Sequence, residues 1–187
     1  MKEIVTLLER DATTQGATFG VYVGRLCPMH AGHQTLIESL IEVFPENHAV
    51  LIGSCNKPIS IRHLFSYADR GDFVKAVFPN ARIAPLPDFE TDASWFRALD
   101  DLLSVMGVNP MQAIYIGGSK EDVEFYYDNG RSVHIINRYN GPTTKVSGSE
   151  VRDAMIEKRS LYGLLDPKII PLVQERFATR WSEVRSR

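Results

Sequence analysis

Five apolar runs, rich in β-branched and aromatic residues, recur along the chain with more polar segments between them. The runs cover residues 18–24, 48–53, 82–86, 113–117 and 132–136. Each run is almost continuously apolar and lacks the alternation of apolar and polar residues that marks a strand with one wet face. The pattern therefore predicts five strands that are covered on both faces.

Segments with helical spacing separate these runs. In each of them, apolar residues recur three or four positions apart, which is the spacing of one helix face. These segments are 33–43, 73–78, 95–106 and 150–158. Asp166 followed by Pro167 resembles a helix cap and a first-turn proline, so we predict that a last helix begins there.

The alternation of strands and helices predicts an α/β fold. We expect a single Rossmann-like, doubly wound and mostly parallel sheet with helices on both faces and a C-terminal helical tail. Residues 1–17 are interpreted as an N-terminal extension, 18–158 as the domain proper and 159–187 as the tail. In such sheets ligands bind beyond the carboxyl ends of the strands, so the loops after the strands should hold the site.

Charge narrows the range of partners. The chain of 187 residues carries 21 Lys and Arg against 23 Asp and Glu, which gives a formal net charge of −2. Binding to nucleic acid or to an anionic membrane depends on excess positive charge, so we expect neither. We expect small-molecule nucleotides as partners, and homo-oligomerisation stays open.

Cysteine usage and the N-terminus indicate the compartment. Cys27 and Cys55 make no disulfide framework, which is typical of a reducing environment. No apolar run approaches the roughly 18 residues of a membrane span. The first residues are too charged for a secretory leader. We therefore expect a cytoplasmic protein.

The loop after the first predicted strand is the main candidate for chemistry. It reads G-R-L-C-P-M-H-A-G-H, from Gly24 to His33, and opens directly into a helix, where free N–H groups and the helix dipole attract anions. Gly32 leaves space at that helix start. His30 and His33 are three positions apart and face one side, so they and Arg25 are suited to a polyphosphate. The alternatives are a zinc pair, which would need a third protein ligand, or two incidental surface histidines.

A second anion site is expected at the helix entry near residue 150. Ser147, Ser149 and Arg152 gather hydroxyl and guanidinium donors beside backbone N–H groups. The simpler interpretation is that Ser149 only caps the helix. Two such sites at opposite ends of one small sheet would hold a triphosphate from both sides.

These motifs resemble those of a known superfamily. The Gly24–His33 loop is similar to the G-R-F-x-P-x-H-x-G-H segment of the nucleotidylyltransferases, and Ser147–Arg152 is similar to their S-x-T-x-x-R segment. Within that superfamily, Gly-Arg after the first strand most resembles nicotinamide-mononucleotide adenylyltransferases of the archaeal and bifunctional bacterial kind. Further matches to that group's segments are Gly53, Ser54, Asp88, Trp95, Gly117 and Gly118.

The resemblance implies roles for these residues. An acceptor phosphate would attack the α-phosphorus of ATP, with His30, His33 and Arg152 as catalytic residues. The implied ATP-binding residues are Gly24, Arg25, Gly32, Ser147 and Ser149. The implied acceptor-binding residues are Gly53, Ser54, Asp88, Trp95, Gly117 and Gly118, with the Trp95 ring stacked on the nicotinamide. Mg²⁺ would be held mainly by the substrate phosphates, without a protein metal site.

Alternative functions stay open at this point. One is transfer of AMP or CMP to another phosphorylated acceptor, and another is a nucleotide-binding regulator without turnover. Retention of both histidines and Arg152 argues against the regulator. A class I aminoacyl-tRNA synthetase would share His-x-Gly-His, but it would need tRNA-binding domains for which 187 residues leave no room.

Several other residues have a less specific interpretation. Trp95 also fits a core position at the start of an amphipathic helix. Further candidates for phosphate contacts are Lys57, Arg62, Arg138 and Lys145. Ordinary strand or surface positions are expected for His48, His63 and His134.

Overall fold

A computed structural model describes residues 1–136 and 146–186. Its centre is a five-stranded sheet in the order β3-β2-β1-β4-β5, and every neighbouring pair of strands is parallel. The strands are β1 (Phe19–Gly24), β2 (His48–Gly53), β3 (Ile83–Leu86), β4 (Ala113–Gly117) and β5 (Ser132–Ile135). The predicted α/β fold with five strands is confirmed.

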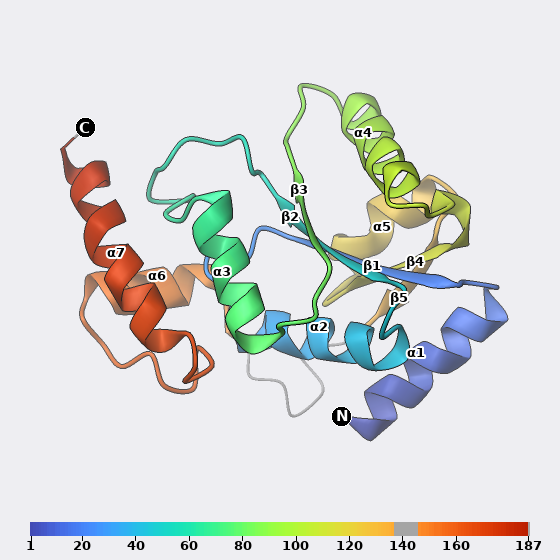
Figure 1. Cartoon of the computed structure of the whole chain (residues 1–187), viewed down its shortest axis with the longest axis horizontal. Helices are drawn as coiled ribbons and strands as arrows, with labels where there is room; N and C mark the ends of the chain where they lie inside the picture. The colour runs from blue at the N-terminus through green and yellow to red at the C-terminus, as the bar shows by residue number, and fades with distance from the viewer. Residues whose placement is uncertain (137–145, 187) are drawn as a thin grey trace.

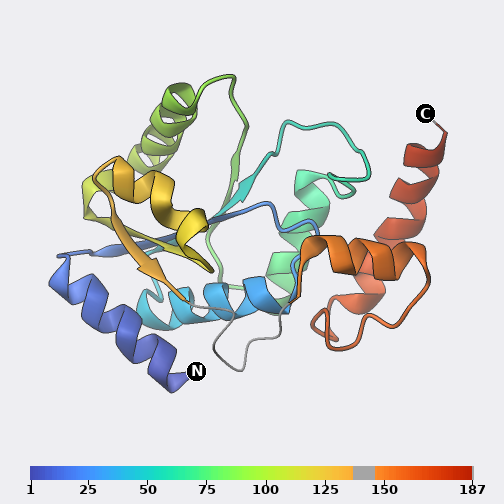
Figure 2. The same cartoon turned by 180° about the vertical axis from the view of Figure 1, so that it is seen from behind.

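Helices cover both faces of the sheet, as Figures 1 and 2 show. They are α1 (Lys2–Thr14), α2 (Ala31–Val43), α3 (Tyr67–Val77), α4 (Asp92–Val105), α5 (Lys120–Asp128), α6 (Gly148–Ile156) and α7 (Ile170–Arg185), with a short 3₁₀ turn at Pro110–Gln112. The side chains of β1 alternate between two hydrophobic cores. Tyr22 packs in the core shared with α1, α2, α3, α6 and α7, and Val21 packs in the core shared with α4 and α5.

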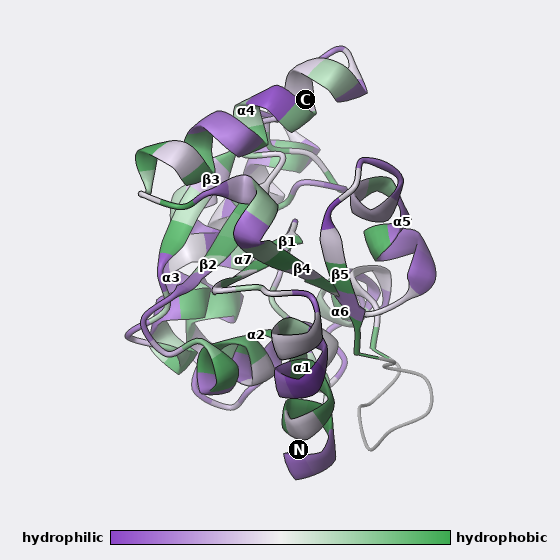
Figure 3. Cartoon of the chain, turned by 90° about the vertical axis from the view of Figure 1, so that its right-hand side faces the viewer, coloured by the Kyte–Doolittle hydropathy of each residue, from purple (hydrophilic) through white to green (hydrophobic). Residues whose placement is uncertain are grey.

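The strand order explains the predicted patterning. β1, β2 and β4 lie inside the sheet and are buried on both sides, so apolar strands lie between more polar outer helix faces, as Figure 3 shows. Pro85 is accommodated because β3 is an edge strand, where a missing N–H breaks no ladder.

Two helices escaped the sequence pattern. α1 has only Val5, Leu8 and Ala12 buried, and the segment from residue 120 has only Val123 and Tyr126 buried. In α5 these sparse apolar positions among charged residues resemble a polar loop. In α1, however, Ile4, Val5, Leu8 and Ala12 follow the spacing of one helix face, so its signal is present in the sequence. Residues 1–17 are therefore mostly a helix, which packs against α2.

The prediction of a helix start at Asp166–Pro167 is wrong. The Asp166 carboxylate accepts a hydrogen bond from Lys168 N (2.8 Å), and the Asp166 carbonyl accepts one from Ile169 N (3.0 Å), so these residues form a turn. The helix begins at Ile170, and Pro171 is its first-turn proline. Of the two prolines in this region, Pro171 and not Pro167 therefore lies in the first turn of the helix.

The chain reverses its direction of travel across the sheet at β1. It adds β2 and β3 on one side, then returns to place β4 and β5 on the other. This switch leaves a crevice beyond the carboxyl ends of β1 and β4, where ligands bind in open parallel sheets. Within the described residues, no helix is long and apolar enough to cross a membrane.

Candidate active site

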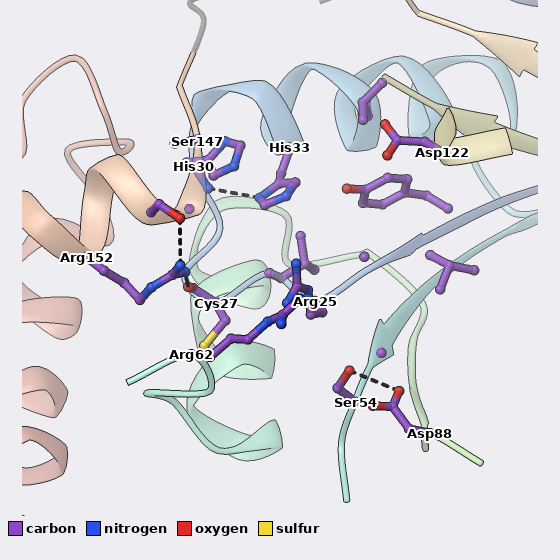
Figure 4. Close-up of a pocket in the computed structure, with 18 of the residues that line it drawn as sticks. Arg25, Cys27, His30, His33, Ser54, Arg62, Asp88, Asp122, Ser147 and Arg152 are labelled. Atoms are coloured by element: carbon purple, nitrogen blue, oxygen red, sulfur yellow. Dashed lines mark hydrogen bonds between the residues drawn. The ribbon is translucent and has the colours of Figure 1, made fainter. Parts of the chain in front are cut away.

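A pocket of about 510 Å³ lies at this crevice, and Figure 4 shows its lining. Eleven of the predicted site residues line it: Gly24, Arg25, His30, His33, Gly53, Ser54, Asp88, Trp95, Ser147, Ser149 and Arg152. They come from the loops after three strands and from the starts of α2, α4 and α6. Gly32, Gly117 and Gly118 are not among the lining residues.

The two histidines form a stacked pair at the start of α2. Their ring centroids are 3.7 Å apart and the planes are inclined by 24°. The His30 main-chain N–H donates to His33 Nδ1 (3.3 Å), so a neutral His33 carries its proton on Nε2. This contact is half of a capping box in which His30 is the N-cap residue. The fold therefore presents an imidazole N–H donor at an anion-attracting helix end.

Small and buried residues make room for this pair. A Cβ at Gly32 would lie 3.3 Å from the His30 ring, so Gly32 acts by letting the ring pack there. Leu26 and Met29 are fully buried and anchor the loop in the core. Gly32 thus shapes the site without lining it.

The start of α6 is the second candidate anion site. Ser147 is the N-cap residue, and its hydroxyl accepts a hydrogen bond from Glu150 N (3.1 Å). The interpretation of Ser149 as the cap is therefore wrong. The Ser149 hydroxyl instead accepts a hydrogen bond from Arg152 Nη2 (2.9 Å), and Arg152 Nη1 donates to the Cys27 carbonyl (3.3 Å).

This second contact joins the two anion sites. Because Arg152 bonds the loop that leads to the histidines, the starts of α2 and α6 face one pocket, as Figure 4 shows. A polyphosphate in this pocket would meet an imidazole donor on one side and a guanidinium on the other.

Asp88 connects the loops after β2 and β3. The Ser54 hydroxyl donates to Asp88 Oδ1 (3.0 Å), and Lys57 Nζ lies 3.5 Å from Asp88 Oδ2. The Asn56 side chain exchanges two 2.9 Å hydrogen bonds with the Asp88 main chain. Asn56, which sequence reasoning missed, therefore fixes the carboxylate at the pocket edge.

Trp95 fits both of its interpretations. Its ring meets Phe125 edge-on at 5.7 Å between centroids and packs against the core beneath α4 and α5. It also lines the main pocket and an adjoining one of about 380 Å³, which Asp88, Asp92 and Phe89 line as well. An aromatic wall beside carboxylates suits a flat cationic ring.

Gly117 and Gly118 act through helix α5. A Cβ at Gly117 would lie 2.6 Å from Val123 Cγ1, so glycine permits the close approach of α5 to β4. Gly118 N donates to Asp122 Oδ2 (3.1 Å), and Asp122 lines the pocket. Asp122 was not singled out as a site residue, although its position after a strand was a signal.

Positive charge also gathers in the pocket lining. Arg25 and Arg62 both line the pocket. Burial lowers the pKa of His63 below its usual value, and Arg25, Arg62 and Arg70 lower it further. Burial raises the pKa of the Cys27 thiol, so it is a packing residue rather than a nucleophile.

The remaining candidates lie outside the pocket or outside the described residues. His48 and His134 are buried and hydrogen-bonded to Phe44 O and Asp11 Oδ2, which fits ordinary structural positions. Arg138 and Lys145 lie in the part of the chain that the structure does not describe.

The donor set bears on metal binding. Among residues 1–136 and 146–186, no cluster of three or more His, Cys, Asp or Glu side chains could hold a metal ion. Asp122 and Asp88 are the carboxylates of the pocket lining. This set fits a divalent ion that is carried mainly by phosphate oxygens and bound by one carboxylate at most.

Fold and site together define an α/β nucleotide-binding protein in which two helix starts face one pocket at the switch point of the sheet. The sequence profile of the Cytidylyltransferase-like family matches residues 21–154, and the chain belongs to this family. The resemblance noted in the sequence is confirmed.

Relatives in sequence are archaeal. The nicotinamide-nucleotide adenylyltransferase of Methanolobus tindarius is 24% identical over 158 residues, covering 82% of this chain and 86% of the relative. The enzyme of the same name from Methanocorpusculum labreanum is 30% identical over 100 residues, covering 51% of this chain and 56% of the relative.

A solved structure supports the fold. The bifunctional NMN adenylyltransferase/ADP ribose pyrophosphatase of Francisella tularensis, complexed with AMP and a manganese ion, aligns with a TM-score of 0.69 and 17% identity. The alignment covers 90% of this chain and 52% of that protein, so the chain spans about half the length of this structural relative.

Proposed function

We propose that this chain transfers AMP from ATP to nicotinamide mononucleotide, forming NAD and releasing pyrophosphate. The observation that carries the proposal is the pairing of two anion sites, the starts of α2 and α6, across one pocket. The archaeal relatives with this activity in their names support the choice of substrates.

The chemistry is a single in-line displacement. A phosphate oxygen of the mononucleotide attacks the α-phosphorus of ATP and forms the new P–O bond. The bond from that phosphorus to the bridging oxygen of the β-phosphate breaks, and pyrophosphate leaves with the electron pair. An ionised phosphate is already a nucleophile, so no general base or covalent intermediate is needed, and catalysis is positioning plus charge stabilisation.

The histidines and Arg152 serve the triphosphate. The His33 Nε2–H and the His30 ring donate toward the charge that develops on the α-phosphate and the leaving pyrophosphate. Arg152, Ser149 and the start of α6 hold the outer phosphates, and Arg25 adds a forked donor between the two sites. Gly24 allows close approach at the end of β1.

The acceptor occupies the other half of the pocket. Ser54 and Asp88 lie where a ribose or carboxamide would be bound, and Trp95 provides the wall for the nicotinamide ring. The backbone around Gly53 borders this space, and Gly117 and Gly118 support it through Asp122.

Mg²⁺ is the proposed metal. When bound to the phosphates, it would neutralise charge on the leaving pyrophosphate. The Francisella tularensis structure holds a manganese ion, which supports a divalent ion in this class. We place the activity in the cytoplasm, where the two free cysteines stay reduced.

A pyrophosphate-release assay tests the proposal. ATP and CTP are each combined with nicotinamide mononucleotide, nicotinate mononucleotide and phosphopantetheine, with Mg²⁺ present. We expect the fastest turnover with ATP and nicotinamide mononucleotide. Faster turnover with CTP, or with phosphopantetheine, would assign the chain to the related transferases instead.

A further inference from the structure

Arg70 lies behind the pocket and does not line it. It belongs to the first turns of α3, and only 2% of its surface is exposed. Its Nη1 donates to the carbonyl oxygens of Arg25 and Gly53, both at 2.7 Å, and its Nη2 donates to that of Ser54 (3.4 Å). One guanidinium thus joins the loop after β1 to the loop after β2.

Both loops hold a strained residue at this junction. Leu26 has φ 50° and Ser54 has φ 53°, a left-handed conformation that is unfavourable for residues with a Cβ. Leu26 directly follows a carbonyl that Arg70 binds, and Ser54 supplies one itself. Such conformations persist only where surrounding contacts hold them, and here one side chain binds both the carbonyl that precedes Leu26 and the carbonyl of Ser54.

The hydrogen bonds of Arg70 go to the main chain. Within the described residues it forms no ion pair with a carboxylate. Its Nε donates to the Ser66 carbonyl (3.2 Å), so all of its hydrogen bonds end on main-chain oxygens. Since a buried cation is costly to leave unpaired, these carbonyl groups are held firmly in place around it.

Helix α3 is itself fixed where Arg70 leaves it. Ser66 caps the helix in a reciprocal box with Asp69, through contacts of 3.0 and 3.2 Å. Arg180 of α7 donates to the same Asp69 carboxylate (2.9 Å). The first turn of α3, which carries Arg70, is therefore anchored to the C-terminal helix α7.

We propose that Arg70 is a positioning residue, which holds the two strained loops together and so places Arg25 and Ser54 in the pocket. The expected effect of Arg70 on catalysis rests on the proposed function, whereas its effect on the order of the two loops does not. Arg70 touches no substrate in this account, and its effect passes through the two loops.

The test compares substitutions of two buried arginines. Arg70→Met removes the hydrogen-bond donors and keeps an unbranched side chain. Arg70→Lys keeps a positive charge on a shorter side chain with fewer donors. Arg131→Met and Arg131→Lys are matched controls. Arg131 directly precedes β5, at the opposite end of the sheet from the pocket. Its side chain is 7% exposed and forms an ion pair with Asp100 of α4.

Hydrogen exchange in the absence of substrate is the first readout. We expect amides in residues 24–30 and 53–57 to exchange at least about tenfold faster in Arg70→Met, with partial recovery in Arg70→Lys. Both Arg131 variants should keep these loops as in the unmodified chain. Unchanged protection of the loops in folded Arg70→Met would overturn the inference.

Kinetics are the second readout. Catalytic efficiency for the acceptor should fall in the order unmodified chain, Arg70→Lys, Arg70→Met, and the Arg131 variants should lose less than threefold. Equal losses at both arginines would overturn the positioning role. If neither Arg70 variant folds while the Arg131 variants do, Arg70 belongs to global stability and the inference fails. An inactive unmodified chain would contradict the proposed function alone, because hydrogen exchange still tests the loops.

Discussion

The tautomer of His33 decides what the pocket offers to a phosphate. Because the His30 N–H occupies Nδ1, the Nε2 edge of a neutral His33 ring is an N–H donor. The stacked His30 ring and the start of α2 hold this donor in one orientation. Preorganised donors of this kind stabilise charge without rearrangement during the reaction.

Replacing His33 should therefore affect the chemical step. We expect His33→Ala to lower kcat by about 10²–10³, the usual effect of losing one preorganised donor. Steady-state rates with saturating substrates measure this, and thermal unfolding confirms that the variant is folded. A kcat within threefold of the unmodified chain would remove His33 from the mechanism.

Trp95 should separate the two substrates. Since its ring borders the proposed acceptor space, Trp95→Ala should raise the KM for the mononucleotide about tenfold or more, while the KM for ATP changes little. Trp181→Ala is the control, because Trp181 stacks on Phe177 in α7, away from the pocket lining. Equal changes in both KM values would assign Trp95 to the core alone.

At the scale of elements, each strand end delivers a different part of the site. β1 leads to the histidine loop, β2 to Ser54, β3 to Asp88 and β4 to Asp122. Parallel pairing brings these ends to one edge of the sheet. The second anion site comes from α6, which Arg152 ties back to the first loop.

The start of β2 contains a pH-sensitive contact. His48 is fully buried, its Nδ1 contacts Phe44 O (2.7 Å) and its Nε2 accepts from Arg82 N (3.1 Å), so the ring is neutral with the proton on Nδ1. Burial lowers the pKa of His48 below 6.5, and nearby Arg82 lowers it further. Protonation would break the Arg82 contact.

Stability should therefore depend on pH through His48. The unfolded chain binds this proton more readily, so the contribution of His48 is present above pH 6.5 and is lost as the pH falls toward the lower folded pKa. Denaturant unfolding at several pH values from about 7.5 to 5.5 measures the slope. His48→Gln should show a smaller loss of unfolding free energy on acidification, and an equal loss would contradict this account.

How far the sequence predicts the molecule differs between its parts. Continuous apolar runs identify all five strands. The prediction that all five are covered on both faces is correct for β1, β2 and β4 and wrong for the edge strands β3 and β5, which keep partly exposed residues. Helix α5 was missed because its two buried residues stand among charged ones and form a weak pattern, whereas α1 was missed although its apolar residues recur at helical spacing. The proline rule favoured Pro167 because Asp166 is a good cap residue, whereas Pro171 follows Ile169 and Ile170, which provide no side-chain cap.

The site shows a similar division. Most of the residues found follow a strand or open a helix, because that position can be recognised in the sequence, although Asp122 was missed despite it. Arg70 and Asn56 were missed because their partners are main-chain atoms of distant loops. An arginine in the first turns of a helix reads as a solvent-exposed charge until the fold shows it buried.

At the scale of the whole molecule, the net charge of the chain differs from the local charge of its pocket. A formal charge of −2 hides a pocket lined by three arginines and two histidines, with Asp88 and Asp122 also in its lining. We expect this arrangement to attract polyphosphate at one place, whereas general affinity for nucleic acid depends on an excess of basic charge, which the sequence lacks. The C-terminal helix α7 also supports the site, because its Arg180 binds Asp69 at the start of α3, the helix that carries Arg70.

The most direct test of the central claim is formation of NAD by the purified chain from ATP, nicotinamide mononucleotide and Mg²⁺, with the dinucleotide identified by mass spectrometry. The double variant His30→Ala/His33→Ala, prepared identically, controls for contaminating activity. The account predicts one NAD per pyrophosphate released, and a rate at least about a thousandfold lower in the double variant. Equal rates in the two preparations, or no NAD from the unmodified chain, would contradict it.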